Sequence, residues 1–430
     1  MAAPVSRRDF TRLFALGGSA ALLADPVWAR QNPSTPALAP GGPASGEAFW
    51  TSVRQQFVMP SDLAVMNAAN LCPSSRAVLD TLTRETRSVD LDPSPANRAR
   101  LYPEKENTRK ALAEFLRVTP DEIIITRNTS ESNNLVSNGL DLEAGDEVLV
   151  HGDNHPSNLN AWREKAKRFG FTVVTVDQKN PHPGPDYYVD AFGRAITPRT
   201  RLIAFTHLTS TVGDLMPARE LCRLARDRGI LSLLDGAQSL GLLDVNLADI
   251  QPDFYSGSAH KWPCGARECG VLFVNKTAQD RLWPSIYSAY PGAVGFSRTF
   301  EGFGQRDEAT MIAFREALTL QTKVGRAAIE QRARALTTKL MDGLANLPGV
   351  KVWTSPDPSR RAAVVSFVPG TLNANALATA LYERDKVAIT TRGGQDRPGL
   401  RVSPHFYNSP AEVDRLVSAL ATYLKSGLSL

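Results

Sequence analysis

Short apolar runs alternate with segments of helical periodicity through the middle of the chain. Runs rich in Ile, Val and Leu predict β-strands at residues 122–126, 147–150, 172–176, 201–206 and 230–234. Between them, apolar residues recur every three or four positions and predict helices at 131–139, 158–169 and 218–228. This alternation indicates an α/β fold, with a mainly parallel sheet covered by helices on both faces. Ligands bind such sheets at the carboxyl ends of the strands.

The flanking segments predict a second, smaller domain. Upstream, we expect helices at residues 47–56, 76–90 and 104–117 and an extended segment at 65–70. Residues 306–347 form one long helical stretch, followed by strands at 350–353, 362–367, 387–389 and 400–402 and helices at 375–384 and 410–425. The prediction is therefore a large domain over 47–310 and, over 311–430, a linking helix and a small α+β domain.

The first 46 residues have the pattern of a targeting segment followed by a leader. Arg7 and Arg8 precede a modestly apolar stretch at 13–24, and residues 27–29 offer a cleavage site. Residues 1–29 resemble a bacterial twin-arginine signal peptide, although Thr11 and Arg12 depart from the usual pattern. The alternative is an accidental arginine pair before a helix. The resemblance implies the twin-arginine translocase as a partner, a periplasmic location and no stable membrane anchor, since the apolar stretch is too short to span. Residues 30–46, rich in Pro, Ala, Gly and Ser, predict a flexible leader.

Composition and charge narrow the class of partner. The 430 residues are 42% hydrophobic and 22% charged, which is an ordinary globular composition. The net charge is +5, but no long Lys/Arg run follows the N-terminal segment, so we expect no nucleic-acid binding. The four cysteines form no CxxC pair and no Cys/His cluster with zinc-ligand spacing. We expect free thiols and no metal; a Cys264–Cys269 disulfide stays open as the less favoured alternative.

Four loops that follow predicted strands carry candidate chemistry. Thr129 and Ser130 lie directly before a predicted helix, where hydroxyl and N–H groups suit a phosphate; the alternative is a plain helix cap. His155, after the next strand, could stack on a flat ring or simply cap its turn. Asp235 and Gln238 could hold a protonated ring nitrogen and a ring oxygen, or Asp235 could cap a helix with Gln238 exposed.

The fourth loop contains Ser258, His260 and Lys261 between two apolar segments. A half-buried lysine in such a turn has a lowered pKa and can attack an aldehyde; the alternative is a solvated loop charge. A phosphate anchor, a ring stacker, an acid for a ring nitrogen and an amine for an aldehyde are what pyridoxal phosphate (PLP) requires. Their order along the chain is more specific than any one motif.

With these four loops the chain resembles the class V, fold type I, PLP-dependent aminotransferase family over about residues 60–425, in particular its isopenicillin N epimerase-like branch. The resemblance implies that Lys261 binds the cofactor covalently and moves the α-proton. It also implies roles in holding the cofactor for the remaining residues of the four loops: the phosphate for Thr129, Ser130, Ser258 and His260, the ring nitrogen for Asp235, the ring oxygen for Gln238 and the ring face for His155.

The resemblance also implies a substrate side and a homodimer. Arg401 matches the arginine that grips a substrate carboxylate, and Asn67 lies in the substrate-side N-terminal loop. Gln305 stands where the family has a threonine that reaches the neighbouring subunit's phosphate, which puts that contact in doubt. No cysteine follows Cys269, whereas the cysteine desulfurase branch needs one near residues 391–398.

These features predict an exported PLP enzyme acting at the α-carbon of a small-molecule or peptidyl amino-acid group. We expect transamination, with epimerisation or β-elimination (C–S lyase chemistry) as alternatives. The export signal adds a similarity to the twin-arginine-exported member of the family that matures pyoverdine siderophores, and residues 291–303 are a candidate lid. A non-catalytic binding protein is a further alternative. A nucleotide-binding α/β protein would need a glycine-rich phosphate loop at the first strand, which this chain lacks.

Overall fold

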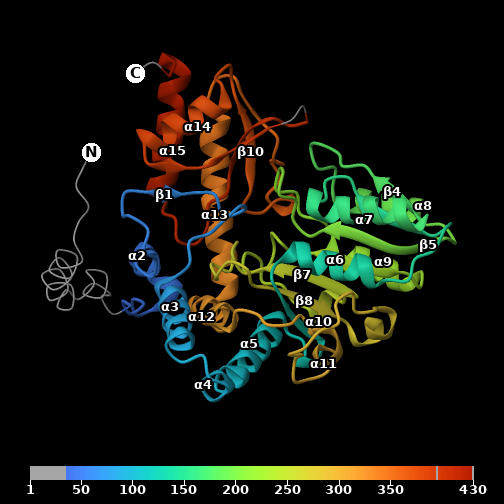
Figure 1. The fold of residues 1–430 in the computed structure, drawn as a ribbon. Helices are drawn as coiled ribbons and strands as arrows, with labels where there is room; N and C mark the ends of the chain where they lie inside the picture. Colours follow the sequence, from blue (N-terminus) through green and yellow to red (C-terminus); the bar gives the residue numbers. More distant parts are fainter. Residues whose placement is uncertain (1–34, 394–395, 429–430) are drawn as a thin grey trace, which may run out of the picture. The chain divides into compact units, whose positions relative to one another are not determined.

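Seven strands form the central sheet, in the order β2-β8-β7-β6-β5-β3-β4 (Figure 1). The computed structural model describes residues 35–393 and 396–428, and residues 39–430 form one structural unit. The predicted twin-arginine signal lies outside the described residues. The strands are β2 (Ile123–Thr126), β3 (Glu147–His151), β4 (Thr172–Val176), β5 (Thr200–Thr206), β6 (Leu231–Asp235), β7 (Phe254–Ser258) and β8 (Gly270–Val274).

The sheet is mainly parallel, as the strand–helix alternation predicts. The pairs β3–β4, β3–β5, β5–β6 and β6–β7 are parallel, whereas β8 is antiparallel to both β7 and β2. Since β2 and β7 both oppose β8, β2 points the same way as the parallel strands. The carboxyl ends of β2, β3, β6 and β7 therefore lie at one edge, and the loop from β7 to β8 carries Lys261.

Helices connect the strands of this sheet and pack against it (Figure 1). Helix α6 lies against β7 and β8, and α9 lies against β6. The helices of this part are α2 (Glu47–Arg54), α3 (Arg76–Leu91), α4 (Pro95–Ala99), α5 (Leu101–Leu116), α6 (Thr129–Gly139), α7 (Pro156–Phe169), α8 (Pro185–Ala195), α9 (Ala218–Asp227), α10 (Leu247–Ile250) and α11 (Ser297–Phe300), with 3-10 turns η2 (Gly42–Ser45), η3 (Pro120–Glu122) and η4 (Lys276–Arg281).

Several helices differ from the predicted elements, and three of the differences have a clear cause. Helix α8 was not predicted, because prolines punctuate its start; Tyr188 and Phe192, one turn apart, bury its inner face. Helix α5 begins at Leu101 rather than 104, since a proline in the first turn costs no helical hydrogen bond. The long helical stretch is two helices, α12 (Glu308–Val324) and α13 (Arg326–Ala345), separated by Gly325 with φ of 96°.

The C-terminal part has a smaller sheet of its own. Strands β9 (Val350–Val352), β10 (Val365–Pro369), β12 (Thr390–Arg392) and β13 (Gly399–Val402) form an antiparallel sheet, in the order β12-β13-β10-β9. Helices α13, α14 (Ala374–Glu383) and α15 (Pro410–Ser426) contribute to its core, and η5 (Pro358–Arg360) lies between β9 and β10.

The N-terminal segment joins this smaller part. Strand β1 (Ala64–Val65) pairs in parallel with β11 (Val387–Ala388), and Ala64 and Met66 are buried in the core with α13 and α15. The predicted domain division places this segment in the large domain, yet its packing is with the small sheet. Within the predicted leader, the described residues include η2, and the Ala39 N–H donates to Ser52 Oγ.

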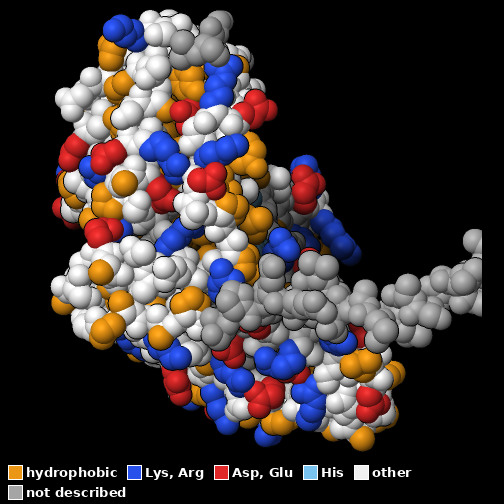
Figure 2. All heavy atoms as spheres, turned by 90° about the vertical axis from the view of Figure 1, so that its left-hand side faces the viewer, with side chains coloured by type: hydrophobic (Ala, Val, Ile, Leu, Met, Phe, Trp, Pro, Cys, Tyr) orange, Lys and Arg blue, Asp and Glu red, His pale blue; other side chains and the backbone are white. Residues whose placement is uncertain are grey.

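The molecular surface has no dominant charge on the face drawn in Figure 2, where Lys and Arg side chains are interspersed with Asp and Glu. Among the described residues, no helix is long and apolar enough to cross a membrane.

Candidate functional site

Asp235, at the carboxyl end of β6, is the buried centre of the site, with 1% of its surface exposed. Its Oδ2 accepts hydrogen bonds from the side-chain amides of Asn133 on α6 (2.9 Å) and Asn158 on α7 (3.1 Å), and its Oδ1 accepts from the Ala237 N–H (3.1 Å). Among the described residues, no Lys, Arg or His lies within ion-pair distance of this carboxylate. The neutral amides therefore hold the carboxylate in place without neutralising it.

Asn133 and Asn158 are site residues that the sequence pattern did not predict. Both are fully buried on the faces that α6 and α7 turn toward the sheet. Asn133 also accepts from Ser256 Oγ (2.7 Å), and Asn158 accepts from Trp162 Nε1 (3.1 Å). Their sequence context gave no clear signal, because each lies among other polar residues of its helix; the structure shows that each buried amide has the partners that it needs.

The start of α6 meets the end of β7. Asn128 caps the helix, since its Oδ1 accepts from the Glu131 N–H (3.0 Å), so Thr129 and Ser130 occupy the first two helical positions. Ser258 Oγ bonds the Thr129 N–H (2.9 Å) and the Thr129 hydroxyl (2.8 Å). This approach requires Gly270 on β8, where a Cβ would lie 2.8 Å from Asn128 Cα. The cap is therefore Asn128 and not a Ser or Thr, as the alternative interpretation predicted, and Thr129, Ser130 and Ser258 form a hydroxyl-lined helix N-terminus that suits a phosphate.

Lys261 is partly buried in the loop between β7 and β8. Desolvation lowers the pKa of its amine to about 8; the nearby Asp235 carboxylate opposes this shift and Arg401 adds to it. Desolvation and then the Lys261 charge lower the pKa of the neighbouring His260 to about 4, so this imidazole is neutral at pH 7. Lys261 is therefore not the solvated loop charge that the sequence left open.

Gln238 is buried and ties this loop to the N-terminal segment. Its Nε2 donates to the Ala69 carbonyl (2.9 Å), and its Oε1 accepts from Trp262 Nε1 (2.7 Å). The alternative of an exposed Gln238 is thus wrong. One N–H of the amide is not engaged by Ala69 and remains available to a ring oxygen.

His155 lies at the more open side of the site. It caps α7, because its Nδ1 accepts from the Ser157 N–H (3.2 Å) and bonds the Ser157 hydroxyl (2.8 Å). Loss of hydration and then the Lys261 charge lower the pKa of His155, while Asp235 raises it. The imidazole is therefore both a cap, as one interpretation predicted, and a neighbour of the lysine.

Arg401 and Asn67 approach from the smaller part of the molecule. Arg401 Nη1 donates to the Ser210 carbonyl (2.8 Å), a contact that the sequence did not predict, and its buried Nε has no partner among the described residues. Desolvation and then Arg392 lower the pKa of Arg401 to about 10. Asn67 pairs with Ser403, and its Oδ1 is also buried without a partner. Such unsatisfied buried atoms mark groups that a ligand can engage.

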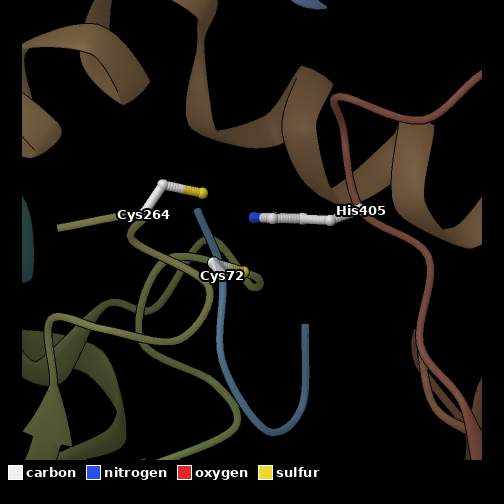
Figure 3. A group of neighbouring side chains, drawn as sticks. All are labelled: Cys72, Cys264 and His405. Atoms are coloured by element: carbon white, nitrogen blue, oxygen red, sulfur yellow. The ribbon is translucent and has the colours of Figure 1, made fainter. Parts of the chain in front are cut away.

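Behind the lysine loop, the fold brings Cys72, Cys264 and His405 together, with their ligand atoms within 4.8 Å of one another (Figure 3). Linear spacing could not show this cluster, because the three residues come from distant segments. Two thiols and an imidazole are ligand types that zinc prefers. Here His405 Nε2 donates to the Trp262 carbonyl (2.7 Å) and Tyr407 donates to Cys72 Sγ (3.7 Å), so the cluster supports the loop. All four cysteines are free and buried.

The donor set fits PLP. The hydrogen bonds to Asp235 all come from neutral groups, the amine of nearby Lys261 has a lowered pKa, and the α6 N-terminus presents hydroxyl and N–H groups. Asn67 and Arg401 each have one buried side-chain atom without a hydrogen-bond partner among the described residues. The four strand-end loops thus come together as their order along the chain predicts.

Comparison with known proteins agrees with this geometry. Residues 92–416 match the model of the family described as aminotransferase class-V. The chain is 31% identical to the isopenicillin N epimerase of Amycolatopsis lactamdurans, over 86% of this chain and 98% of that protein. It is 25% identical to a probable cysteine desulfurase of Methanothermobacter thermautotrophicus, over 86% and 96%. A solved mutant of C-DES, with glycine covalently linked to its PLP cofactor, superposes with a TM-score of 0.78 at 25% identity, covering 86% of this chain and 98% of that one. The chain therefore belongs to the aminotransferase class-V family of fold type I, PLP-dependent enzymes.

Proposed function

We propose that the protein acts at the α-carbon of an amino acid or peptidyl amino-acid group, and that its reaction is transamination. The observation that carries this proposal is the placement of the Lys261 amine near the buried, cation-free carboxylate of Asp235, with Arg401 on the substrate side. When bound, PLP supplies an electron sink for the α-carbon.

Each residue then has a physical task. Asp235 keeps a ring nitrogen protonated, and Asn133 and Asn158 fix its orientation. Thr129, Ser130, Ser258 and His260 hold the phosphate at the α6 N-terminus. Gln238 donates to the ring oxygen and His155 covers one ring face.

On the substrate side, Arg401 binds the α-carboxylate and Asn67 contacts the amino-acid group. Lys261 takes the α-proton as a free amine, which the pKa of about 8 makes accessible near neutral pH. Transamination moves a proton along one face of the substrate, which a single lysine accomplishes. The proposal therefore rests on one base at Lys261.

Epimerisation is the second candidate, because isopenicillin N epimerases are 31% and 30% identical to this chain. Inversion returns the proton on the opposite face and needs a second proton-transfer group. The pKa of His155 is lowered, so its imidazole could accept the α-proton while the protonated amine of Lys261 returns a proton to the other face. Desulfurase chemistry through a C-terminal cysteine is not proposed, since no cysteine follows Cys269.

Absorbance and product analysis test the proposal. The protein loaded with PLP should be yellow, and Lys261→Ala should abolish the visible band, while the exposed control Lys276→Ala retains it. Amino acids and peptidyl amines, each with and without a 2-oxo acid, should yield amine transfer that depends on the oxo acid. Deuterium incorporation with inverted chirality and no transfer would favour the epimerase, and a colourless wild type without affinity for PLP would favour a non-catalytic protein.

We further propose export through the twin-arginine pathway into the periplasm, with a peptidyl secondary metabolite such as a siderophore as the substrate. The support is the resemblance of residues 1–29 to a twin-arginine signal. Replacing Arg7 and Arg8 together by Lys should retain the protein in the cytoplasm, and undiminished export would contradict the assignment. Reaction with a peptide but with no free amino acid would support the tailoring role.

A homodimer is also proposed. A cavity of about 580 Å³ opens where Gln305, Arg306, Tyr102 and Tyr290 meet. Large exposed apolar side chains occur in the segments that contribute to this cavity or adjoin them in sequence: Leu91, Tyr102, Trp283, Ile286, Tyr287 and Tyr290. Exposed apolar groups of this kind mark interaction surfaces. Light scattering should give twice the chain mass, and a double charge substitution, Tyr102→Glu with Tyr290→Glu, should reduce it to one.

A further inference from the structure

The small sheet presents two arginines to the site rather than one. Thr390 on β12 lies directly opposite Arg401 on β13, so both side chains project from the same face. Arg392, two residues further along β12, shares that face and is the diagonal neighbour of Arg401, at a spacing of about 7–8 Å. Two basic groups at this spacing can contact two separate anionic groups.

This face looks onto the large domain. Ser366 on β10 is also opposite Arg401, and its hydroxyl donates to the Thr211 carbonyl. The adjacent Ser210 carbonyl accepts from Arg401 itself. The two arginines therefore lie on the side of the small sheet that meets the loop after β5, near the lysine and His155.

Neither Arg392 nor Arg401 has an ion-pair partner among the described residues, and Asp153 and Asp396 act on Arg392 only from a longer distance. Arg392 Nε donates to the Arg397 carbonyl, at 3.3 Å. The nearby acids are already engaged, because Arg397 binds Asp153 in two contacts (3.0 and 3.3 Å) and also pairs with Asp396. Two partly buried like charges are unfavourable unless a ligand supplies anions.

We propose that Arg392 and Arg401 form a two-carboxylate clamp, so that the substrate is an amino acid with a second, distal carboxylate. Arg401 takes the α-carboxylate, as in the proposed function on which this inference rests, and Arg392 takes the distal one. Guanidinium groups bind carboxylates as bidentate pairs, which gives the clamp its selectivity for acid over amide. The second carboxylate belongs either to a free amino diacid or to a larger metabolite.

Ligands without an amine test the clamp separately from the chemistry. The PLP-loaded full chain is titrated with glutarate and with butyrate, and affinity is measured by thermal shift and calorimetry. We expect glutarate to bind at least about tenfold more tightly, which corresponds to about 1.4 kcal/mol, because only glutarate can pair with both guanidinium groups. Spectral titrations with glutamate, glutamine and a glutamyl peptide distinguish a free diacid from a linked one.

Variants assign the selectivity to a residue. Arg392→Gln should reduce the glutarate-to-butyrate ratio to about one and leave butyrate affinity unchanged, Arg392→Lys should restore part of the ratio, and Arg401→Gln should weaken both ligands. Arg384→Gln, an exposed arginine whose Nη1 donates to the Leu428 carbonyl, is the matched control. An unchanged ratio in Arg392→Gln, or no preference in the wild type, would overturn the clamp. Glutarate preference without any response to amino acids would instead refute the proposed function alone.

Discussion

Two buried carboxylates, Asp235 and Glu301, are almost equally inaccessible, at 1% and 2% exposed, but have opposite surroundings. Asp235 accepts only from neutral amides and one backbone N–H. Glu301 forms two contacts with Arg109 (2.7 and 3.0 Å), a third with Lys105 (3.3 Å) and a fourth with the Ile125 N–H (2.9 Å). When protein cations surround a buried carboxylate, they neutralise its charge. When only neutral donors surround it, the carboxylate can still bind a cation that a ligand brings. Burial alone therefore does not identify a functional acid; the charge of its partners does.

Substitution at Asp235 should give the largest effect on turnover. Asp235→Asn keeps the size of the side chain and removes the charge that stabilises a protonated ring nitrogen. We expect turnover to fall by roughly 10²–10³-fold, the magnitude typical for loss of one preorganised electrostatic group. Steady-state kinetics on the PLP-saturated variant measure this, and an Asp235→Asn enzyme with wild-type turnover would remove the basis of the comparison.

Substitution at Glu301 should instead affect stability. Glu301→Gln removes the more buried of the two carboxylates that Arg109 and Lys105 share and leaves them only Glu106, which should cost up to about 3–5 kcal/mol in the free energy of unfolding. Urea denaturation measures this, and turnover of the folded fraction should stay close to the wild type. If Glu301→Gln kept wild-type stability but lost activity, Glu301 would be a functional acid and not a structural one.

Acidification sharpens the same contrast. Burial alone would raise the pKa of Glu301, but Arg109 and Lys105 outweigh it and hold the pKa below its ordinary value of 4.5. The stabilisation is therefore complete above about pH 4.5 and is lost as pH falls through the lowered folded pKa. The stability difference between wild type and Glu301→Gln should shrink in that acidic window. A difference that stays constant there would contradict an ionised Glu301.

The sequence predicted one of these acids and not the other, and the reason is distance along the chain. Asp235 follows a β-branched strand and precedes Gln238 and Lys261 in a recognisable order, so its place could be inferred from local pattern. Glu301 meets Arg109 across 192 residues, and its burial follows from the packing of α5 beside the chain after α11. Local pattern carries no information on such a pair.

The same limit explains the other omissions. Asn133 and Asn158 look like ordinary polar helix residues until the helices dock on the sheet. The helical stretch divides at Gly325 because this glycine has a positive φ of 96°, which interrupts the helix. The periodicity of apolar residues does not reveal such a backbone change. Arg392 became informative only when the β12–β13 register placed it on the face of Arg401.

The pH dependence of cofactor binding should also distinguish Asp235 from Glu301, with an effect of intermediate size. Because the pKa of Lys261 is lowered to about 8, the fraction of free amine rises as pH passes through that value. The rate at which the apo-protein combines with PLP should rise with the same midpoint and level off above it. The Asp235 charge raises this pKa, so Asp235→Asn should shift the midpoint to lower pH, and Glu301→Gln should leave it in place. Stopped-flow absorbance gives the midpoint; a value near 10.4, as for a solvated lysine, would contradict a desolvated amine.

The smallest effect is expected from the amides that hold Asp235. Asn158→Ala removes one of its three hydrogen bonds and leaves the charge, so the carboxylate loses orientation rather than ionisation. A hydrogen bond to a charged group is worth about 1.5–3 kcal/mol, so turnover should fall by roughly ten- to a hundredfold, less than in Asp235→Asn. Asn138→Ala, exposed on α6, is the control for a general loss of helix packing.

Asn158→Asp replaces a hydrogen-bond donor by a second carboxylate beside Asp235 and should reduce turnover further, because the two like charges repel each other. If Asn158→Ala and Asn138→Ala had the same turnover, the hydrogen bond from Asn158 would not position Asp235. The functional difference between Asp235 and Glu301 would then depend only on the ion pairs that Glu301 forms and Asp235 lacks.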